Sequence, residues 1–371
     1  MEFTVAKADL VRELNLSQGV VEKKTTIPIL SNVLLEAEGD RIVLTATDLE
    51  LGIRCGCAAR VTREGSGTIP AKRLLDYVRL LPDADVNVKF LENQWASLTC
   101  GRSRTRMAGM SRESFPELPE APESVVEIPV GLLSAMISRT SFAISLEESR
   151  FTLNGALLVL RPDAIVMVST DGHRLAYVES QGAEAEVRKP FRALIPKKAM
   201  TEIIKLGQEC EASAKVQMGG DENHLFFRLG ERQLITRKLT GNFPDYDRVL
   251  PKENPHVIVL ERDEFRAAVE RVSQFADERS HAIRLQFGEG EVKFYSASAD
   301  TGESEESLPC EYSGPNVDVG YNGHYLLEFL RVVNTDRVRL LFRDAKGAGE
   351  LQPDGESEGF QYRYVIMPMR V

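Results

Sequence analysis

Long apolar runs, paired cysteines and an excess of positive charge are all missing from this 371-residue sequence. No apolar run approaches the roughly 18 residues that a membrane-spanning helix needs, and Met1–Val5 does not resemble a secretion signal. The net charge of −10, taken alone, argues against a nucleic-acid ligand. An odd number of cysteines without metal-type spacing favours reduced thiols in the cytoplasm: Cys55, Cys57, Cys100, Cys210 and Cys310. We therefore expect a cytoplasmic protein with no membrane segment, metal or cofactor.

A repeated turn sequence is the clearest positive signal. The stretch Ser169–Tyr177 places Asp171-Gly172 between two alternating segments, a pattern typical of a β-hairpin. Weaker copies stand at residues 45–50 and 296–301, so the aspartates at 48, 171 and 300 are 123 and 129 residues apart. Because each spacing is close to one third of the chain, the sequence predicts one domain present in three copies.

Helix and strand patterns follow the same period. Ile69-Pro70-Ala71-Lys72 opens a helix, and Ile195-Pro196-Lys197-Lys198 opens another 126 residues later. Six amphipathic helices and roughly two dozen strands favour an α+β fold with helices on one face of antiparallel sheets. Segments rich in proline and glutamate at 115–124 and 250–256 predict domains at residues 1–125, 126–253 and 254–371. Repeats of this kind build solenoids, rings or arrays.

Basic side chains are concentrated on the predicted helices. Helices 71–81, 131–143 and 197–206 together carry a net charge of +5 in a chain of −10. The cations are Lys72, Arg73, Arg79, Arg139, Lys197, Lys198 and Lys205. On one helix this would indicate only a solvated face, but repetition over three helices favours a surface that faces a polyanion. Without base-reading motifs, such contact would be made to phosphates.

Several short motifs, taken in order, resemble the bacterial DNA polymerase III beta subunit family, the sliding clamps. Each motif is weak alone, and the set is specific because it runs through all three thirds of the chain. The motifs are Thr26–Asn32, Thr45–Glu50, Leu153-Asn154-Gly155, Thr170–Ala176, Asn242–Tyr246, Arg248–Pro251 and Met367–Arg370.

This resemblance implies three tandem clamp domains with sheets outside and two helices per domain lining a ring. Two chains would join head to tail, giving six domains in a dimeric ring. Twelve helices about 10 Å apart leave a hole of roughly 28 Å. The implied function is a processivity factor without catalytic activity, located on the nucleoid, that encircles duplex DNA independently of sequence. The DNA-facing groups would be the seven helix cations with Lys24, Arg150 and Phe151.

The resemblance also implies a peptide-binding pocket for partner proteins. Its ligand would be a Gln-Leu-Phe type motif on DNA polymerase III alpha, clamp-loader subunits and repair proteins. Carried over by motif, the pocket wall comprises Leu153, Thr170, Gly172, His173, Arg174, Leu175, Pro244, Arg248, Val249, Asn322, Tyr325, Val365, Ile366, Met367, Pro368, Met369 and Arg370. We expect Leu175, Val249, Val365 and Ile366 to form an apolar slot. Arg174 and Arg248 would pair with polar peptide groups.

Two parts of the sequence differ from the family pattern, and a third set of residues would form the dimer contact. Ser280 replaces a bulkier residue at the pocket edge, and Lys346-Gly347-Ala348 replaces more apolar or hydroxyl-bearing neighbours. At the dimer edge, Thr105 and Met107 would face Gln274 and Phe275 of the partner chain.

Two rival functions remain open from the residues themselves. Asp171, His173 and Arg174 could form an acid–base cluster, although no serine elbow, HExxH sequence or Walker loop accompanies them. The other rival is a repeat-built scaffold that binds proteins and encloses no DNA.

Overall fold

The computed structural model describes residues 1–21, 26–181, 185–355 and 359–370. These residues form two compact units. The first contains the described parts of residues 1–134, 184–188 and 198–238, and the second those of residues 135–183, 189–197 and 239–371. Among the described residues, no helix combines the length and apolar character needed to cross a membrane.

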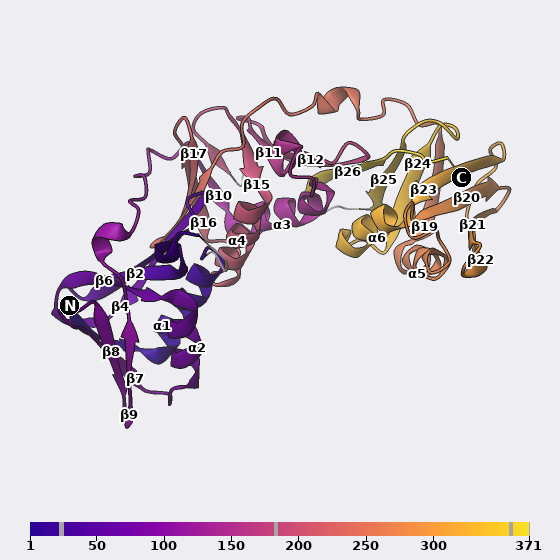
Figure 1. Cartoon of the computed structure of the whole chain (residues 1–371). Coiled ribbons are helices and arrows are strands. Elements are labelled where there is room, and N and C mark those ends of the chain that lie inside the picture. Colours follow the sequence, from indigo (N-terminus) through magenta and orange to yellow (C-terminus); the bar gives the residue numbers. More distant parts are fainter. Residues whose placement is uncertain (22–25, 182–184, 356–358, 371) are drawn as a thin grey trace. The chain divides into compact units, whose positions relative to one another are not determined.

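The described residues form three copies of one order of elements (Figure 1). The first copy comprises β1 (Glu2–Ala6), α1 (Lys7–Gln18), β2 (Asn32–Glu38), β3 (Arg41–Thr47), β4 (Leu51–Ala58), β5 (Arg60–Arg63), β6 (Gly65–Pro70), α2 (Ala71–Leu80), β7 (Asp85–Phe90), β8 (Trp95–Cys100) and β9 (Ser103–Ala108). The second comprises β10 (Val126–Pro129), α3 (Val130–Thr140), β11 (Gly155–Leu160), β12 (Ala164–Thr170), β13 (Arg174–Gln181), β14 (Glu186–Val187), β15 (Phe191–Pro196), α4 (Lys197–Gln208), β16 (Lys215–Gly220), β17 (His224–Leu229) and β18 (Arg232–Arg237). The third comprises β19 (His256–Glu261), α5 (Arg262–Ser273), β20 (Ala282–Gly288), β21 (Glu291–Ser298), β22 (Gly302–Pro309), β23 (Val317–Asn322), α6 (Gly323–Val332), β24 (Arg337–Phe342), β25 (Gly349–Asp354) and β26 (Phe360–Ile366). The prediction of a threefold α+β repeat is confirmed.

Each copy contributes two antiparallel rows of strands. In the first copy these rows are β5-β1-β7-β8-β9 and β4-β3-β2-β6, and the second copy repeats both as β14-β10-β16-β17-β18 and β13-β12-β11-β15. The third copy has β22-β21-β20-β23 and a row reduced to β19-β24-β25-β26, because residues 310–316 form no strand there.

Neighbouring copies share continuous sheets. Strand β18 of the second copy pairs with β4 of the first, and β26 of the third pairs with β13 of the second. The resulting sheets contain nine and eight strands within the described residues. Both junctions therefore join the last strand of one copy to the third strand of the long meander in the copy before it.

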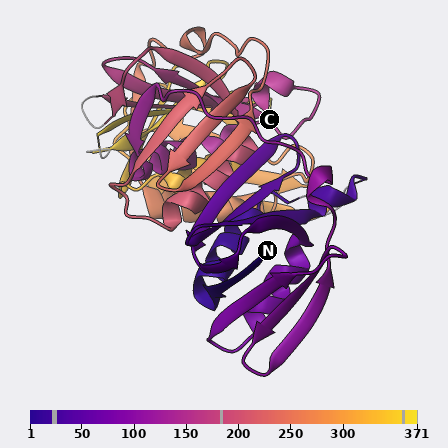
Figure 2. The same cartoon turned by 90° about the vertical axis from the view of Figure 1, so that its left-hand side faces the viewer.

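The helices bury one face and expose the other, as their sequence period requires. In α2, Leu74 and Val78 are fully buried whereas Lys72 and Arg73 are exposed. Pro70 ends β6 and caps α2 at the position where a missing N–H costs nothing. Helices α1 and α2 pack against each other in the first copy, as α5 and α6 do in the third (Figures 1 and 2).

Candidate functional site

The predicted Asp171-Gly172 hairpin forms and is held by its own side chains. Strands β12 and β13 pair in antiparallel register on either side of it. Asp171 Oδ1 accepts hydrogen bonds from the backbone amides of His173 at 2.9 Å and Arg174 at 3.1 Å. Gly172 has a φ of +92°, a conformation that glycine adopts readily. Because the Asp171 carboxylate serves the turn, it is engaged as a structural acceptor.

The first copy builds the same turn at Asp48. Its Oδ1 accepts from the amides of Glu50 at 3.0 Å and Leu51 at 2.7 Å. The preceding threonine hydroxyl, of Thr47 here and of Thr170 in the second copy, donates to the carbonyl four residues later. These shared hydrogen bonds explain why the sequence motif repeats.

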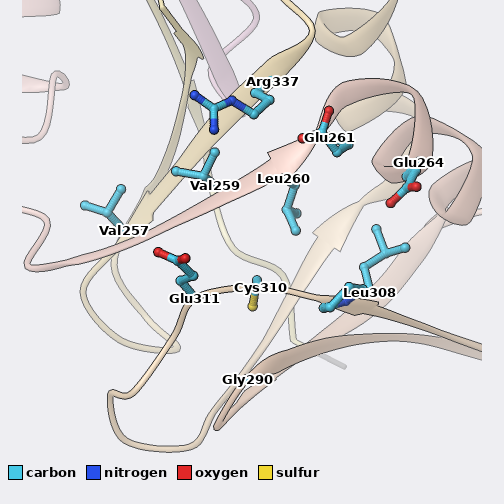
Figure 3. A pocket seen from close by; sticks show the side chains of 11 residues that line it. Val257, Val259, Leu260, Glu261, Glu264, Gly290, Leu308, Cys310, Glu311 and Arg337 are labelled. Atoms are coloured by element: carbon cyan, nitrogen blue, oxygen red, sulfur yellow. The ribbon is translucent and has the colours of Figure 1, made fainter.

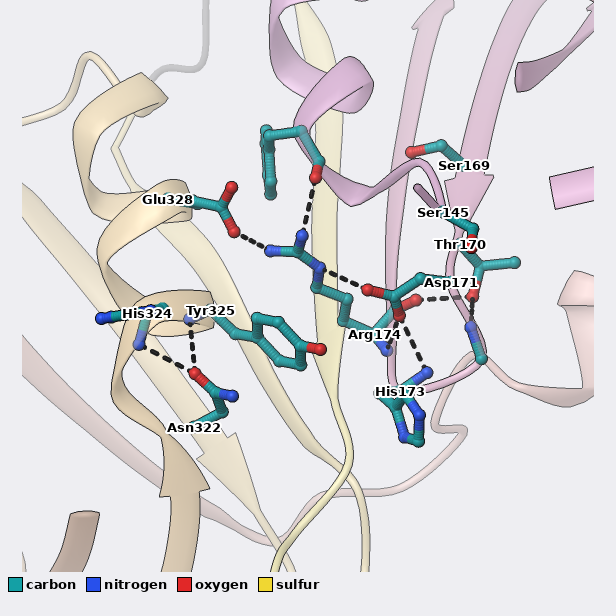
Figure 4. Close-up of polar contacts among 12 residues, drawn as sticks. Ser145, Ser169, Thr170, Asp171, His173, Arg174, Asn322, His324, Tyr325 and Glu328 are labelled. Atoms are coloured by element: carbon teal, nitrogen blue, oxygen red, sulfur yellow. Dashed lines mark hydrogen bonds and ion pairs between the residues drawn. The ribbon is translucent and has the colours of Figure 1, made fainter. Parts of the chain in front are cut away.

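Arg174, the first residue of β13, is the centre of a polar cluster (Figure 4). Its guanidinium donates to Asp171 Oδ2 at 3.0 Å, to the Phe142 carbonyl at 2.7 Å and to Glu328 of α6. The ring of Tyr325 lies 4.1 Å from the guanidinium carbon. Burial alone would lower the pKa of Arg174, but Tyr364 and Glu328 raise the pKa above its ordinary value.

Arg174 is held mainly by the chain itself, and its pairing with a bound peptide stays a prediction. The residue is only 8% exposed, and its three acceptors come from the chain itself. Of the expected apolar slot, Leu175, Val365 and Ile366 are all at most 1% exposed, and the slot itself stays a prediction. Leu175 and Val365 face each other across β13 and β26 and belong to the hydrophobic core. These residues form the support behind the candidate wall.

The exposed part of the candidate wall comes from other members of the set. Val249 is 40% exposed and Met367 is 43% exposed, both high values for apolar side chains. Arg248 is also exposed, and it pairs with Asp245 at 2.9 Å in the turn that contains the short helix Tyr246–Arg248. Leu153 lies half-buried against the core behind them.

The C-terminal segment is fixed beside this wall by two backbone hydrogen bonds. The Met367 amide donates to the His173 carbonyl at 2.9 Å, and the Met369 amide donates to the Gly320 carbonyl at 2.8 Å. Asn322 caps α6 by accepting from the amides of His324 and Tyr325, as Figure 4 shows. The remaining wall residues are placed by these elements: Thr170, Gly172 and His173 in the β12–β13 turn, Pro244 before the 246–248 helix, and Pro368 and Arg370 after β26.

Sequence reasoning missed a cavity of about 480 Å³ that Arg248 and Val249 line. The other lining residues are Leu250, Pro251, Lys252, Glu253, Asn254, Arg343, Asp344, Lys346, Gly347 and Ala348. The predicted wall residues Arg248 and Val249 and the Lys346–Ala348 difference pointed to this place, whereas Lys252, Glu253, Asn254, Arg343 and Asp344 were not predicted. Asp344 Oδ1 accepts from the amides of Lys346 and Gly347 at 2.8 Å, and Ala348 packs against the core cluster. Ser280 is partly buried, and its carbonyl accepts from Asn322 at 3.4 Å.

Four of the expected DNA-facing cations within the described residues are exposed, Lys72, Arg73, Arg79 and Lys198, whereas Arg150, Lys197 and Lys205 are half-buried. Lys72 pairs with Asp76 at 2.5 Å, Lys205 with Glu202 at 2.7 Å, and Lys198 with Asp48. The Lys72–Asp76 pair is exposed on both sides and contributes little to stability, so Lys72 can exchange its partner for phosphates. Lys198 and Lys205 pair with carboxylates that are mostly buried. Arg73 is exposed, Arg79 is exposed beside Asn15, and burial lowers the pKa of Lys197.

Four further residues were expected to face DNA: Lys24, Arg139, Arg150 and Phe151. Arg139 is 8% exposed, because its guanidinium stacks over Phe360 with its central carbon 4.5 Å from the ring centre, so the expected solvent-facing cation is corrected to a buried one. Arg150 pairs with Glu147 at 2.8 Å, and Phe151 is 69% exposed. Lys24 lies outside the described residues.

The expected dimer residues lie on two separate elements. Thr105 and Met107 belong to β9, the last strand of its five-stranded sheet, and Met107 is buried. Gln274 and Phe275 follow α5, and the Phe275 ring approaches Gly302 at the start of β22. Strand β22 is likewise the last strand of its sheet.

Replacing Arg174 tests whether the cluster is structural. We expect Arg174→Met to lower the free energy of unfolding by about 2–4 kcal/mol, because Asp171 and Glu328 lose their shared cation. The matched control is Arg248→Met, since that side chain is 86% exposed and its loss should cost less than about 0.5 kcal/mol. Urea unfolding measures both, and equal stability of the two variants would contradict the structural role.

Family models match nearly the whole chain in three consecutive parts. The N-terminal, central and C-terminal domains of the DNA polymerase III beta subunit match residues 1–119, 127–245 and 247–370, respectively. The beta sliding clamp of Pseudomonas putida is 35% identical over 378 residues, which cover 100% of both chains. That of Chlamydia pneumoniae is 33% identical and covers 100% of this chain and 99% of the relative. The crystal structure of the DNA polymerase III subunit beta from Pseudomonas aeruginosa matches with a TM-score of 0.93 at 33% identity, covering 100% of each chain.

Proposed function

The chain belongs to the DNA polymerase III beta subunit family and has the role of a DNA sliding clamp, and from this premise we propose how it performs that role. Two chains join head to tail into a ring of six domains that encircles duplex DNA. The ring has no catalytic activity of its own. It tethers the replicative polymerase, clamp-loader subunits and repair proteins through a Gln-Leu-Phe type motif.

The arrangement of the sheet edges carries this proposal. Both junctions inside the chain join the last strand of one copy to the third meander strand of another, as β18–β4 and β26–β13. Each copy has one last strand and one third meander strand. The last strand of the first copy, β9, and the third meander strand of the third copy, β22, have no such partner within the described residues, and both lie at sheet edges. A third junction of the same kind therefore needs a second chain, and repeated head-to-tail contacts that close form a ring.

The charges on these two edges are complementary. Strand β9 exposes Arg104 and Arg106, and β22 exposes Glu303 and Glu305. An unpaired edge of a soluble protein is open to pairing with another strand. Opposite charges favour pairing of β9 with β22 and disfavour pairing of either edge with itself.

Weak contact with DNA is what a sliding ring requires. A closed ring stays on DNA by topology, so its cations need only attract phosphates without fixing a register. The exposed cations Lys72, Arg73 and Lys198 of α2 and α4, with the half-buried Lys205, suit this role, whereas Arg139 is buried and does not.

The peptide site combines the exposed apolar groups with a fixed support. Val249 and Met367 offer apolar contacts, and the flexible Met367 side chain can adapt to different peptides. Arg248 is the exposed cation available to polar peptide groups, while the Arg174 cluster holds the β12–β13 turn in place.

Charge reversal of the α2 and α4 cations tests the encircling function. We expect the variant Lys72→Glu, Arg73→Glu, Lys198→Glu to fall off loaded circular DNA at least tenfold faster, because each change replaces attraction to phosphates by repulsion. Retention is measured by gel filtration of DNA-bound, labelled protein.

The matched control reverses three exposed cations on sheets, Lys215, Arg228 and Arg237. This control should be retained like the unchanged protein. Unaltered retention of the helix variant, or equal loss of both variants, would favour a scaffold that encloses no DNA.

A further inference from the structure

The third copy lacks a strand that both other copies have. In the first copy, β5 pairs with the outer side of β1, and in the second, β14 pairs with the outer side of β10. Strand β19 is the equivalent of β1 and β10, yet it is the last strand of its sheet. The sheet edge that a short strand covers in the first and second copies is therefore open in the third copy.

Backbone groups of β19 point toward this open side. The Arg262 amide donates to the Asp336 carbonyl at 2.7 Å. Leu260 and Ile258, two and four residues earlier, therefore also bond toward β24. Because bonded residues alternate along an antiparallel strand, the amides and carbonyls of Val257, Val259 and Glu261 face outward. These groups offer hydrogen bonds to an added strand.

The segment that should cover this edge is bonded elsewhere. The Cys310 amide donates to the Gly290 carbonyl at 3.0 Å, and the Gly290 amide donates to the Tyr312 carbonyl at 3.0 Å. The Tyr312 ring is buried, with ring centres 5.8 Å from His256 and 5.9 Å from Phe342. The backbone of residues 310–312 is thereby bonded to the β20–β21 turn, while the Tyr312 ring packs on His256 at the start of β19.

A cavity of about 600 Å³ occupies the position of the missing strand (Figure 3). Val257, Val259 and Leu308 give it apolar walls, and Glu261, Glu264 and Glu311 surround it. Within the part of the chain that the structure describes, none of these three carboxylates lies in an ion pair. The cation that also lines the cavity, Arg337, is paired with Asp354 at 2.9 Å, so the rim is acidic.

We propose that this edge slot, formed by β19 and residues 308–311, binds an extended peptide in which two basic residues flank a short, uncharged β-branched segment. Strand β5 indicates the chemistry of the occupant, because its sequence Arg60-Val61-Thr62-Arg63 fills the equivalent slot of the first copy. Val61 of β5 lies opposite Phe3 of β1. When the first copy is aligned to the third by the starts of α1 and α5, Ile258 of β19 takes the position of Phe3. Arg63 and Arg60 lie opposite Glu2 and Thr4, whose counterparts in β19 are Val257 and Val259, so the two basic residues of the peptide lie beside these valines.

The occupant is a segment of another protein that adds a strand to the sheet. Main-chain hydrogen bonds supply the affinity, and the acidic rim supplies the selectivity for basic residues. The slot is formed by one chain alone, so the proposal does not depend on DNA binding or on dimerisation.

Two capped, fluorescein-labelled peptides test the slot on the full-length protein: Ala-Arg-Val-Thr-Arg-Gly and its charge-reversed form Ala-Glu-Val-Thr-Glu-Gly. At about 1 mM, we expect the arginine peptide to slow hydrogen exchange of the Val257 and Val259 amides at least fivefold, since strand addition gives them acceptors. The glutamate peptide should leave exchange unchanged. No protection by the arginine peptide, or equal protection by both peptides, would overturn the proposal.

Two variants separate specific binding from surface attraction. The double variant Glu261→Lys, Glu311→Lys should lose protection by the arginine peptide and gain it with the glutamate peptide. Val259→Pro removes one outward amide without removing a bond to β24, and it should abolish protection at Val257. The control Asp163→Lys, Glu222→Lys changes two exposed carboxylates elsewhere and should bind the arginine peptide normally. Normal arginine-peptide binding by both slot variants would overturn the proposal.

Discussion

Changing Arg104 and Arg106 to glutamate is expected to convert the dimer into monomers. The two side chains are exposed on the edge strand β9, which we propose pairs with β22 of a second chain. After the change, four carboxylates face one another across each junction, with Glu303 and Glu305 on the other side. Like charges placed together cost several kcal/mol, which corresponds to an increase in Kd on the order of a thousandfold. Sedimentation equilibrium measures this shift.

A complementary variant makes this prediction specific. Glu303→Arg, Glu305→Arg should also be monomeric, because its β22 then repels the unchanged basic β9. Mixed in equal amounts, the two variants should form a heterodimer, since each junction again joins an acidic edge to a basic one. Arg228→Glu, on the inner strand β17, is the control and should leave the dimer intact. Failure of the mixture to associate would contradict the β9–β22 pairing.

Placing a charge on the exposed apolar wall should abolish binding of a Gln-Leu-Phe type peptide. Val249 and Met367 are 40% and 43% exposed, so aspartate at either position can remain in water when no peptide is bound. A bound apolar side chain would force that carboxylate out of water, which costs roughly 2–3 kcal/mol, or about 30- to 150-fold in Kd. Fluorescence anisotropy of a labelled peptide measures the change.

Removal of residues 367–371 should have the same effect on the peptide and leave the dimer intact, because that segment lies outside β9 and β22. Leu80→Asp provides the matched control, since Leu80 is 85% exposed on α2 and lies outside the candidate wall. An unchanged titration of the peptide with both wall variants and the deletion would refute the site assignment.

Local signals made the fold predictable from the sequence. The Asp171-Gly172 hairpin depends on hydrogen bonds within four residues, and the same threonine and aspartate bonds recur at Asp48. The Ile-Pro sequences before α2 and α4 likewise mark a strand end and a helix start within two residues. Because these signals act over short distances and recur about one third of the chain apart, they indicated the repeat and the order of its elements.

Burial of charged residues could not be predicted in this way. Arg139 has helical spacing that suits an exposed face, but Phe360, more than two hundred residues away, covers its guanidinium. Arg174 belongs to a motif that suggests a ligand contact, yet Glu328 of α6 and the Phe142 carbonyl occupy its donors. Both outcomes depend on contacts between distant segments, for which one sequence carries no local signal.

The open edge of β19 was also hidden from the sequence. Residues 310–316 stand where β5 and β14 stand in the other copies, and strand patterns alone do not distinguish them. What diverts this segment is the burial of Tyr312 between His256 and Phe342, again a contact between distant parts of the chain.

The mass of the unmodified protein in solution tests the central claim most directly, because two unpaired, complementary sheet edges on one chain require a second chain. Sedimentation equilibrium at micromolar concentration should give about twice the chain mass of 41.4 kDa. A mass of 41.4 kDa that stays constant up to the highest soluble concentration would contradict head-to-tail closure of two chains.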